Sequence, residues 1–179
     1  MKPIFLIGYM GCGKTTVGVE LARQTGLEFI DLDDFIQQKE GMTIEEIFDK
    51  KGEKEFRKLE TAALEEVAKK HDVVIGCGGG TPCHGFNIEL MLESGPTIWL
   101  KSDLERLIAR LLLPQEKAKR PRIAYLADED VLPLVERELE ERSPFYNQAK
   151  FYIDSSGIDT AEGLERTIKE IAYVLMLDV

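Results

Sequence analysis

The chain has 179 residues, of which 44% are hydrophobic and 31% charged, and its formal net charge is -10 at pH 7. This length and balance fit a single globular domain with a continuous core, and the acidic charge argues against nucleic acid as a partner because binding a phosphate backbone needs a basic face. The three cysteines form no C-x-x-C pair, and no apolar run approaches the roughly 18 residues of a membrane span, so we expect a soluble, cytoplasmic protein with no membrane partner.

A strand, a phosphate-binding loop and a helix are the first predicted elements. Four apolar residues, Ile4 to Ile7, precede GYMGCGKT, which has the spacing G-x-x-x-x-G-K-[ST]. Backbone N–H groups of such a loop surround nucleotide phosphates, Lys14 reaches the β and γ oxygens, and the Thr15 hydroxyl can ligate Mg²⁺. Helical spacing behind Lys14 continues until Gly26, which disfavours the alternative of a glycine-rich turn without a ligand. The predicted nucleotide-binding residues of the loop are Gly11, Cys12, Gly13, Lys14, Thr15 and Thr16.

Cys12 lies between two glycines of this loop, beside Lys14 and at a helix N-terminus. Both neighbours favour a thiolate over a thiol, so we expect Cys12 to be alkylated faster than Cys77 or Cys83 and to be protected by nucleotide. The alternative is a side chain that points into the core behind the loop, because only the backbone has to face the phosphates.

Carboxylates follow the second predicted strand. The apolar run from Leu27 to Ile30 ends at Asp31, Asp33 and Asp34, and ligands of open α/β sheets bind at this end of the strands. Since no aspartate follows the later strand at 73–75, Asp31 is the best placed second metal ligand beside Thr15, acting through water. Asp33 is then free to orient or deprotonate an acceptor hydroxyl. The carboxylates could equally well only cap the next helix.

A long helical region is expected next. Thr43 with Glu46 forms a capping box, Gly52 interrupts the helix, and apolar residues at helical spacing continue from Phe56 to Val67.

Two further strands and a glycine-rich turn come after it. Val73 to Ile75 predicts a third strand, which leads into five residues, 76–80, with unusual backbone freedom. Thr97 to Leu100 predicts a fourth strand, and Ser102 with Glu105 is expected to cap the helix that follows.

The next segment, PQEKAKRPR at 114–122, is basic and punctuated by proline, which favours a mobile loop over a packed element. A helix is expected after this segment, and Pro144 is expected to end that helix nearby. The inward face of that helix is predicted to carry Leu132, Val135, Leu139 and Arg142.

The chain ends with one more strand and helix. Phe151 to Ile153 predicts a fifth strand, and Asp159 with Glu162 is expected to cap the last helix. Strands that alternate with helices imply an α/β fold of three layers, in which a parallel sheet of about five strands is covered by helices on both faces.

The arginines indicate what kind of substrate could bind, because a guanidinium can form two parallel hydrogen bonds with a carboxylate and a lysine cannot. Arg57 has Glu53 and Glu60 one helical turn away on either side, which favours an ordinary surface ion pair. Arg142, on an otherwise inward-facing stripe, needs a partner, and either a substrate or an internal acid could supply it.

Taken together, these residues resemble the shikimate kinase family over nearly the whole chain. The first motif is shared by a superfamily, whereas the combination is specific. The matching pieces are GYMGCGKTTVG at 8–18, FIDLDDFI at 29–36, Phe56-Arg57 with Glu60, Gly78 to Gly80, Arg120-Pro121, and RSPFY at 142–146.

The resemblance implies a single P-loop kinase domain, 1–179, acting as a monomer that phosphorylates the 3-hydroxyl of shikimate with ATP and Mg²⁺ in aromatic amino acid biosynthesis. It places the substrate on an excursion at about 32–62. Asp33 would contact the hydroxyls, Arg57 and Arg142 would hold the carboxylate, and Gly79 and Gly80 would line the ring.

The same resemblance makes the basic segment a lid, at about 112–124, that closes over ATP and excludes water. Lys14 and Arg120 would act on the transferring phosphate, and Arg110 would stack on adenine. Arg122-Ile123 departs from the two aliphatic residues that usually follow the lid Arg-Pro in this family.

Two alternatives stay open. Another small-metabolite kinase of the same fold, for gluconate or a nucleoside monophosphate, would share the loop but not the two separated arginines. A catalytically idle nucleotide-binding regulator would be supported by loss of Asp31, Asp33 or Arg120, and all three are present.

Overall fold

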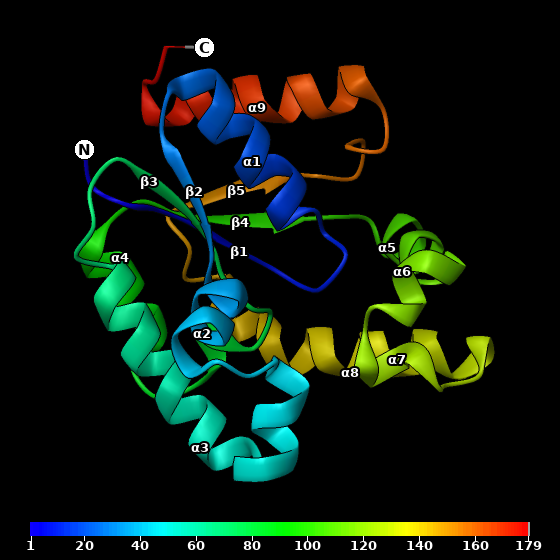
Figure 1. Cartoon of the computed structure of the whole chain (residues 1–179). Coiled ribbons are helices and arrows are strands. Elements are labelled where there is room, and N and C mark those ends of the chain that lie inside the picture. The colour runs from blue at the N-terminus through cyan, green and yellow to red at the C-terminus, as the bar shows by residue number, and fades with distance from the viewer. Residues whose placement is uncertain (179) are drawn as a thin grey trace.

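Five short apolar segments form one parallel sheet in the computed structural model, which describes residues 1–178 (Figure 1). The strand order is β2-β3-β1-β4-β5, so the strand that leads into the phosphate loop lies in the middle. Its Phe5 is in register with Ile75 on one side and Thr97 on the other. The strands are β1 (Ile4–Ile7), β2 (Glu28–Asp31), β3 (Val73–Gly76), β4 (Thr97–Lys101) and β5 (Phe151–Asp154).

Helices cover both faces of this sheet, as the alternation of strands and helices predicts. One face carries α1 (Lys14–Thr25) and α9 (Ala161–Leu175), which pack over a core that includes Leu6, Val17 and Ile168. The other face carries α3 (Ile44–Val67), α4 (Asn87–Ser94) and α8 (Asp128–Tyr146). The α/β prediction with a five-stranded parallel sheet is confirmed.

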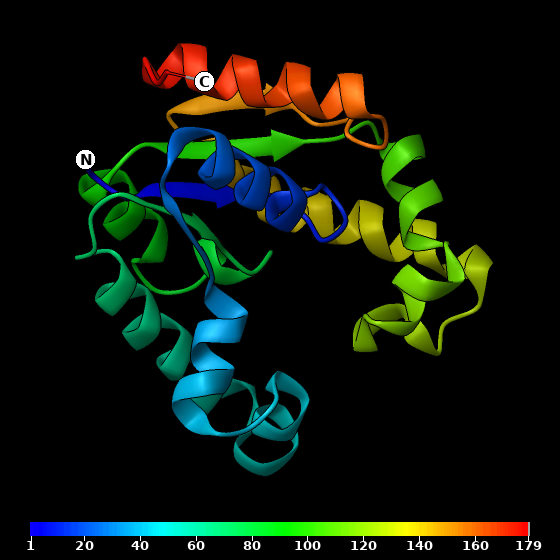
Figure 2. The same cartoon turned by 45° about the horizontal axis from the view of Figure 1, so that its top comes forward.

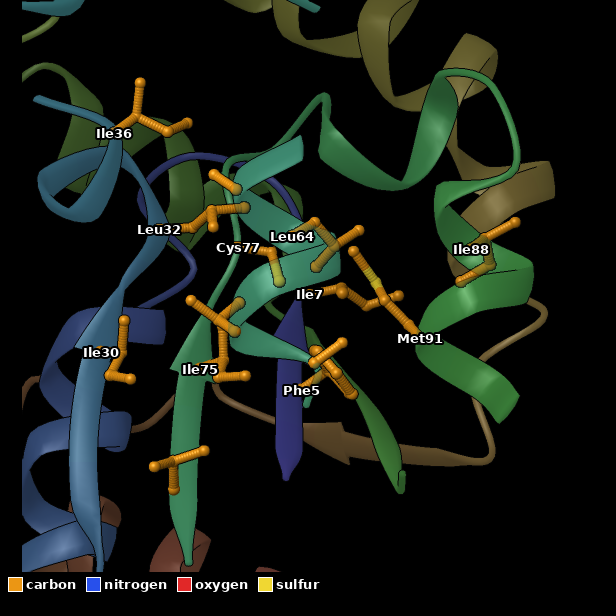
Figure 3. Close-up of a cluster of buried hydrophobic side chains, with 14 of the residues drawn as sticks. Phe5, Ile7, Ile30, Leu32, Ile36, Leu64, Ile75, Cys77, Ile88 and Met91 are labelled. Atoms are coloured by element: carbon orange, nitrogen blue, oxygen red, sulfur yellow. The ribbon is translucent and has the colours of Figure 1, made fainter. Parts of the chain in front are cut away.

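The larger core lies between the sheet and α3, α4 and the end of α8. Figure 3 shows alternate residues of β1 pointing into it, with Phe5 and Ile7 facing Leu64 of α3 and Met91 of α4. This cluster continues under α2 (Leu32–Glu40), where Leu32 and Ile36 are fully buried. The helix that carries Asp33 is therefore anchored directly to the sheet.

The predicted interruption of the long helix is confirmed. Gly52 has φ 78° and ψ 168°, outside the helical region, and the chain bends there within α3. The capping box of Thr43 and Glu46 at the start of α3 is also present.

Three short helices lie beyond the carboxyl end of β4 (Figure 2). They are α5 (Leu104–Leu111), α6 (Pro114–Ala118) and α7 (Pro121–Ala124), so the segment 114–122, predicted to be a mobile loop, forms short helices instead, and its mobility stays a prediction. Ile123, just after that segment, is fully buried against Leu111, Val131 and Val135. One apolar anchor at the end of a polar segment gives the short helices a surface to pack on.

Two predicted helix caps are also wrong, whereas the predicted helix end near Pro144 is confirmed. The residue before α5 is Asp103, with no side-chain cap, and Thr160 rather than Asp159 caps α9 by accepting a hydrogen bond from the Gly163 N–H. Helix α8 continues past Pro144 to Tyr146. Pro144 lies on the exposed side of α8, where water can hydrate the carbonyl that loses its partner.

The inward face of α8 differs from the predicted stripe. Leu132 is 40% exposed, and the buried positions nearest to it are Val131, Val135 and Glu138. The predicted stripe is shifted because Glu138, a charged residue, occupies a buried position that an apolar pattern does not include. Among the helices of residues 1–178, none is long and apolar enough to cross a membrane.

Candidate active site

A cleft of about 850 Å³ opens above the phosphate loop, at the carboxyl ends of the central strands. Parallel α/β sheets bind ligands at this edge. Most of the residues predicted for nucleotide, metal and phosphoryl transfer line it, namely Gly11, Gly13, Lys14, Thr15, Thr16, Asp31, Asp33, Gly79, Arg110 and Arg120.

The phosphate loop has the backbone conformation that its glycines predict. Gly13 has φ 95°, and a Cβ there would lie 1.9 Å from the Ile158 Cδ1 atom, so only glycine fits. Helix α1 begins at the next residue, and its N-terminus faces the cleft. Lys14 donates from Nζ to the carbonyl oxygens of Gly8, at 2.8 Å, and Tyr9, at 2.9 Å.

Cys12 does not present its thiol to the cleft. The side chain is 1% exposed and belongs to the core below the loop. The expectation of fast alkylation is therefore wrong, because an alkylating reagent has no access to the sulfur, and only the backbone of Cys12 remains available to phosphates.

Asp31 caps the next helix, which is one of the two alternatives that the sequence left open, and it also contacts Thr15. Its Oδ1 accepts the backbone N–H of Asp33 at 3.1 Å and so caps α2. Its Oδ2 accepts the hydroxyl of Thr15 at 3.2 Å. The cap and a metal-binding role are compatible, because one oxygen serves each.

Asp33 projects from the first turn of α2 toward the glycine turn, and its Oδ1 is 3.3 Å from the position of a Cβ on Gly78. Burial raises the pKa of this carboxyl to about 6, and the nearby charges of Asp31 and Glu60 add to the effect, while Lys14 opposes it. A carboxylate with a pKa close to neutrality accepts a proton more readily than an ordinary aspartate does.

Two arginines converge on the glycine turn from different helices. A Cβ on Gly79 would lie 3.2 Å from Nη1 of Arg142, and a Cβ on Gly80 would lie 3.2 Å from Nη1 and Nη2 of Arg57. A Cβ at either glycine would be in tight contact with a guanidinium, which would have to shift slightly. The fold therefore brings together four predicted site residues, Arg57, Gly79, Gly80 and Arg142, although the two arginines lie 85 positions apart in the sequence.

Arg57 also forms the ion pairs that its helical neighbours predict. It donates to Glu60 at 2.8 Å and to Glu53 at 3.2 Å. Glu60 is 1% exposed and accepts the Thr81 hydroxyl at 2.6 Å, so Arg57 is held by a fixed acid rather than by a mobile surface group. Thr81 begins a short 3-10 turn, η1 (Thr81–Cys83), after the glycines. Its hydroxyl is therefore the group that joins this turn to Glu60.

Arg142 has an internal acid as its partner. Its Nη2 is 2.8 Å from Oε2 of Glu138, one turn earlier on α8. Below it, Tyr146 donates its hydroxyl to the carbonyl oxygen of Gly79 at 2.6 Å, and the Tyr146 ring packs against Trp99. Tyr146, packed on Trp99, thus fixes the turn that Arg142 faces.

Arg110 and Arg120 also line the cleft. Arg110 donates to both carboxylate oxygens of Asp159, at 2.6 and 2.8 Å, and to the carbonyl oxygen of Ser156 at 2.7 Å. Arg120 pairs with Glu116 at 2.8 Å. The guanidinium of Arg110 is thereby fixed by several partners, whereas that of Arg120 is paired only within its own short segment.

Sequence reasoning missed Glu138 and gave Glu60 and Tyr9 no role in the site. The signals available were the spacing of Glu138 four residues before Arg142 and of Glu60 three residues after Arg57, each of which places an acid beside an arginine on a helix. Nothing in the sequence showed that both acids are buried.

Comparisons with known proteins agree on one family. The model of the family described as SKI, shikimate kinase, matches residues 10–172. The chain is 42% identical over 176 residues to a shikimate kinase of Parabacteroides distasonis, which covers 98% of each protein.

Solved structures give the same result. A shikimate kinase from Bacteroides thetaiotaomicron has a TM-score of 0.94 at 37% identity, covering 98% of this chain and 99% of the other. One from Acinetobacter baumannii in complex with shikimate has a TM-score of 0.83 at 32% identity, covering 98% and 94%. A gluconokinase from Sinorhizobium meliloti is similar in fold alone, with a TM-score of 0.58 at 17% identity.

Proposed function

The chain belongs to the shikimate kinase family, and from this premise we propose how its residues carry out the transfer of the γ-phosphoryl group of ATP to the 3-hydroxyl of shikimate. The activity is that of an ATP-dependent phosphotransferase of aromatic amino acid biosynthesis. The observation that supports the assignment best is the pair of arginines at the Gly79–Gly80 turn, next to Asp33 and the phosphate loop. A hydroxylated carboxylic acid has a carboxylate that matches the arginines and a hydroxyl that matches Asp33, while the phosphate loop takes the phosphates of ATP.

Arg57 and Arg142 hold the shikimate carboxylate, because two guanidiniums meet at a turn that carries no side chain. The ring then lies on Gly79 and Gly80. Its 3-hydroxyl meets Asp33, which orients it and accepts its proton as the bond to phosphorus forms. Since catalysis of phosphoryl transfer is mostly positioning and charge neutralisation, a single weak base is enough.

The other half of the cleft takes ATP. The N–H groups of the phosphate loop and Lys14 bind the phosphates, and Lys14 exchanges its two carbonyl partners for phosphate oxygens. Arg120 separates from Glu116 when the lid closes, and its guanidinium then neutralises charge on the transferring phosphoryl group. Arg110, fixed by Asp159, presents the flat face of its guanidinium to adenine.

Thr15 and Asp31 fit a Mg²⁺ ion that arrives with ATP. The two side-chain oxygens are 3.2 Å apart, and hydroxyl and carboxylate oxygens are ligands that Mg²⁺ prefers. A bound Mg²⁺ would supply positive charge for the phosphates of ATP. Thr15 would hold it through its hydroxyl and Asp31 through a water molecule.

Asp31→Asn should therefore lower activity in a way that added Mg²⁺ partly restores. The amide keeps the cap on α2, because its oxygen can still accept the Asp33 N–H, but it loses the charge that attracts the metal. The measurement is kcat as a function of Mg²⁺ concentration at saturating ATP. A Mg²⁺ optimum identical to that of the unsubstituted protein would move the second ligand to another residue.

Residues 112–124 act as a lid, and hydrogen exchange should show it. Except for Ile123, the segment has few buried side chains, so its amides should exchange fast without ligand and slowly with nucleotide and shikimate together. The measurement is mass-spectrometric exchange of the peptide spanning 112–124 in four states. Equal protection in the free and doubly bound protein would contradict closure.

A coupled ADP-release assay across three acceptors tests the function itself. Shikimate should be the preferred acceptor, with gluconate and nucleoside monophosphates at background, because only shikimate has both the carboxylate and the ring that the turn accommodates. Preference for either other acceptor would assign a different kinase of this fold, and binding of ATP with no turnover on any acceptor would indicate a regulator. We also propose a cytoplasmic monomer, since one chain supplies every residue of the site and ATP is available in the cytoplasm.

A further inference from the structure

Glu138 is a buried acid at the junction of three parts of the molecule. Its side chain is 3% exposed. Oε2 accepts the hydroxyl of Tyr9, in the phosphate loop, at 2.7 Å and pairs with Arg142 of the same helix at 2.8 Å. Oε1 accepts a hydrogen bond from Arg122, on the short helix α7 within the lid. Phosphate loop, lid and carboxylate-binding arginine thus share one carboxylate.

The cluster of Glu138, Tyr9, Arg122 and Arg142 carries a net positive charge. Burial, followed by the hydrogen bond to Glu138, raises the pKa of Tyr9 far above its usual range, so Tyr9 is a neutral donor. One negative charge then faces the positive charges of Arg122 and Arg142. A surplus positive charge remains, and it is available to an anionic ligand.

The two terminal nitrogens of Arg142 are directed to different tasks. Nη2 pairs with Glu138, whereas Nη1 faces the glycine turn, 3.2 Å from the position of a Cβ on Gly79. The ring of Tyr9 supports the same guanidinium, 5.2 Å from its Cζ atom. Glu138 therefore holds Nη2 of Arg142, while Nη1 faces the turn at which the shikimate carboxylate is proposed to bind.

Arg122 and Arg142 both pair with Glu138, so the pairing of Arg122 affects how strongly Glu138 binds Arg142. A buried carboxylate is costly when its oxygens lack partners, and without Arg122 the Oε1 atom would lose its partner, which leaves Arg142 as the other cation of the cluster that can supply one. Glu138 would then compete with the substrate carboxylate for the same planar donor fork. With Arg122 in place, the lid satisfies Oε1, and Nη1 of Arg142 stays directed to the turn.

We propose that Glu138 is a positioning residue for shikimate: it holds Arg142 at the Gly79–Gly80 turn and couples that arginine to the lid through Arg122. This inference rests on the proposed role of Arg142. It adds that docking of α7 and binding of the acid favour each other, although Arg122 does not contact the acid. By reciprocity, shikimate alone should strengthen the contact of the lid with α8.

Arg122→Gln is the first variant of the test. Because Arg122 is 61% exposed, the variant should fold normally, and the KM for shikimate should rise by about fivefold while the KM for ATP stays within about twofold. Arg137→Gln is the matched control, since it removes the same charge from an exposed position adjacent to Glu138 in sequence, and it should change neither KM. Arg122→Lys should recover part of the loss, because it keeps the charge with a single donor point.

Glu138→Gln and the double variant complete a cycle. Glu138→Gln should raise the KM for shikimate by roughly tenfold, and adding Arg122→Gln should then raise it by less than about twofold further. Independent, multiplying effects would overturn the coupling, as would an unchanged KM for shikimate in Arg122→Gln. If Glu138→Gln does not fold, the KM values of Arg122→Gln and its control still decide.

Arg142→Lys, measured in parallel, separates this inference from the proposed function. An unchanged KM for shikimate in Arg142→Lys would contradict the proposed role of Arg142, and the inference with it. A raised KM in Arg142→Lys with no effect of Arg122→Gln and only a lower melting temperature in Glu138→Gln would leave the proposed function standing and reject the coupling.

Discussion

Asp33→Asn should reduce kcat by about a thousandfold while ATP still binds, because general base catalysis by a positioned carboxylate contributes roughly 10²–10⁴. The amide has nearly the same shape but cannot take up a proton. Steady-state turnover gives kcat, and titration with a fluorescent ATP analogue gives nucleotide affinity. Turnover close to that of the unsubstituted protein would exclude Asp33 as the base.

The pH profile supplies a second readout for the same residue. With a pKa of about 6, Asp33 is mostly protonated below that pH and cannot accept the hydroxyl proton. The value of kcat/KM for shikimate should therefore fall tenfold for each unit below about pH 6 and level off above pH 7. The residual activity of Asp33→Asn should lack this acidic limb, whereas an unchanged limb would assign it to another group.

The stability of Asp33→Asn distinguishes a chemical defect from a folding defect. The pKa of Asp33 is raised in the folded protein, so the native state binds this proton more tightly than the unfolded chain does. As pH rises from about 4 through about 6, ionisation of Asp33 therefore costs stability, and the full cost is present at pH 7. Asp33→Asn removes that cost and should melt at the same temperature or higher at pH 7.

Arg142→Lys and Arg57→Lys should each raise the KM for shikimate by roughly thirtyfold, since losing one two-point contact with a carboxylate costs about 2 kcal/mol. The KM for ATP should change far less, because neither arginine is among the residues that line the cleft above the phosphate loop. Each lysine keeps its charge and can still pair with Glu138 or Glu60, so the folded structure is retained.

Arg23→Lys serves as the control for the arginine variants, because Arg23 pairs with Glu20 on the exposed side of α1. It should leave both KM values unchanged. If Arg57→Lys or Arg142→Lys spares shikimate and instead lowers the melting temperature, that arginine is a partner of its acid and nothing more.

Much of the fold could be predicted from the sequence because the determining signals are local. Four apolar residues before the glycines, the capping box at Thr43 and the break at Gly52 each involve residues within one turn or one strand. Of the predictions that failed, the two helix caps were misplaced by one residue, whereas the loop predicted at 114–122 failed because of contacts outside that segment. Ile123 packs under α8, and this contact turns a polar segment into two short helices.

The same distinction applies to the site. Loop residues and the aspartates after β2 follow from spacing, because a strand end and a helix start bring them together. The acids behind the arginines do not, since burial of Glu138 depends on Tyr9 and Arg122 arriving from other parts of the chain. Cys12 shows the converse: its neighbours suggest a reactive thiol, but packing of the loop on the core turns the sulfur away.

Calorimetric binding of shikimate and of its uncharged carboxamide, each to the unsubstituted protein and to Arg142→Lys, tests the placement of the carboxylate between two arginines most directly. We predict that the carboxamide binds the unsubstituted protein at least roughly thirtyfold more weakly than shikimate, and that this ratio shrinks severalfold in Arg142→Lys because the lost contact is shared. The same ratio in both proteins would show that Arg142 does not hold the carboxylate, and would contradict the site proposed for this chain.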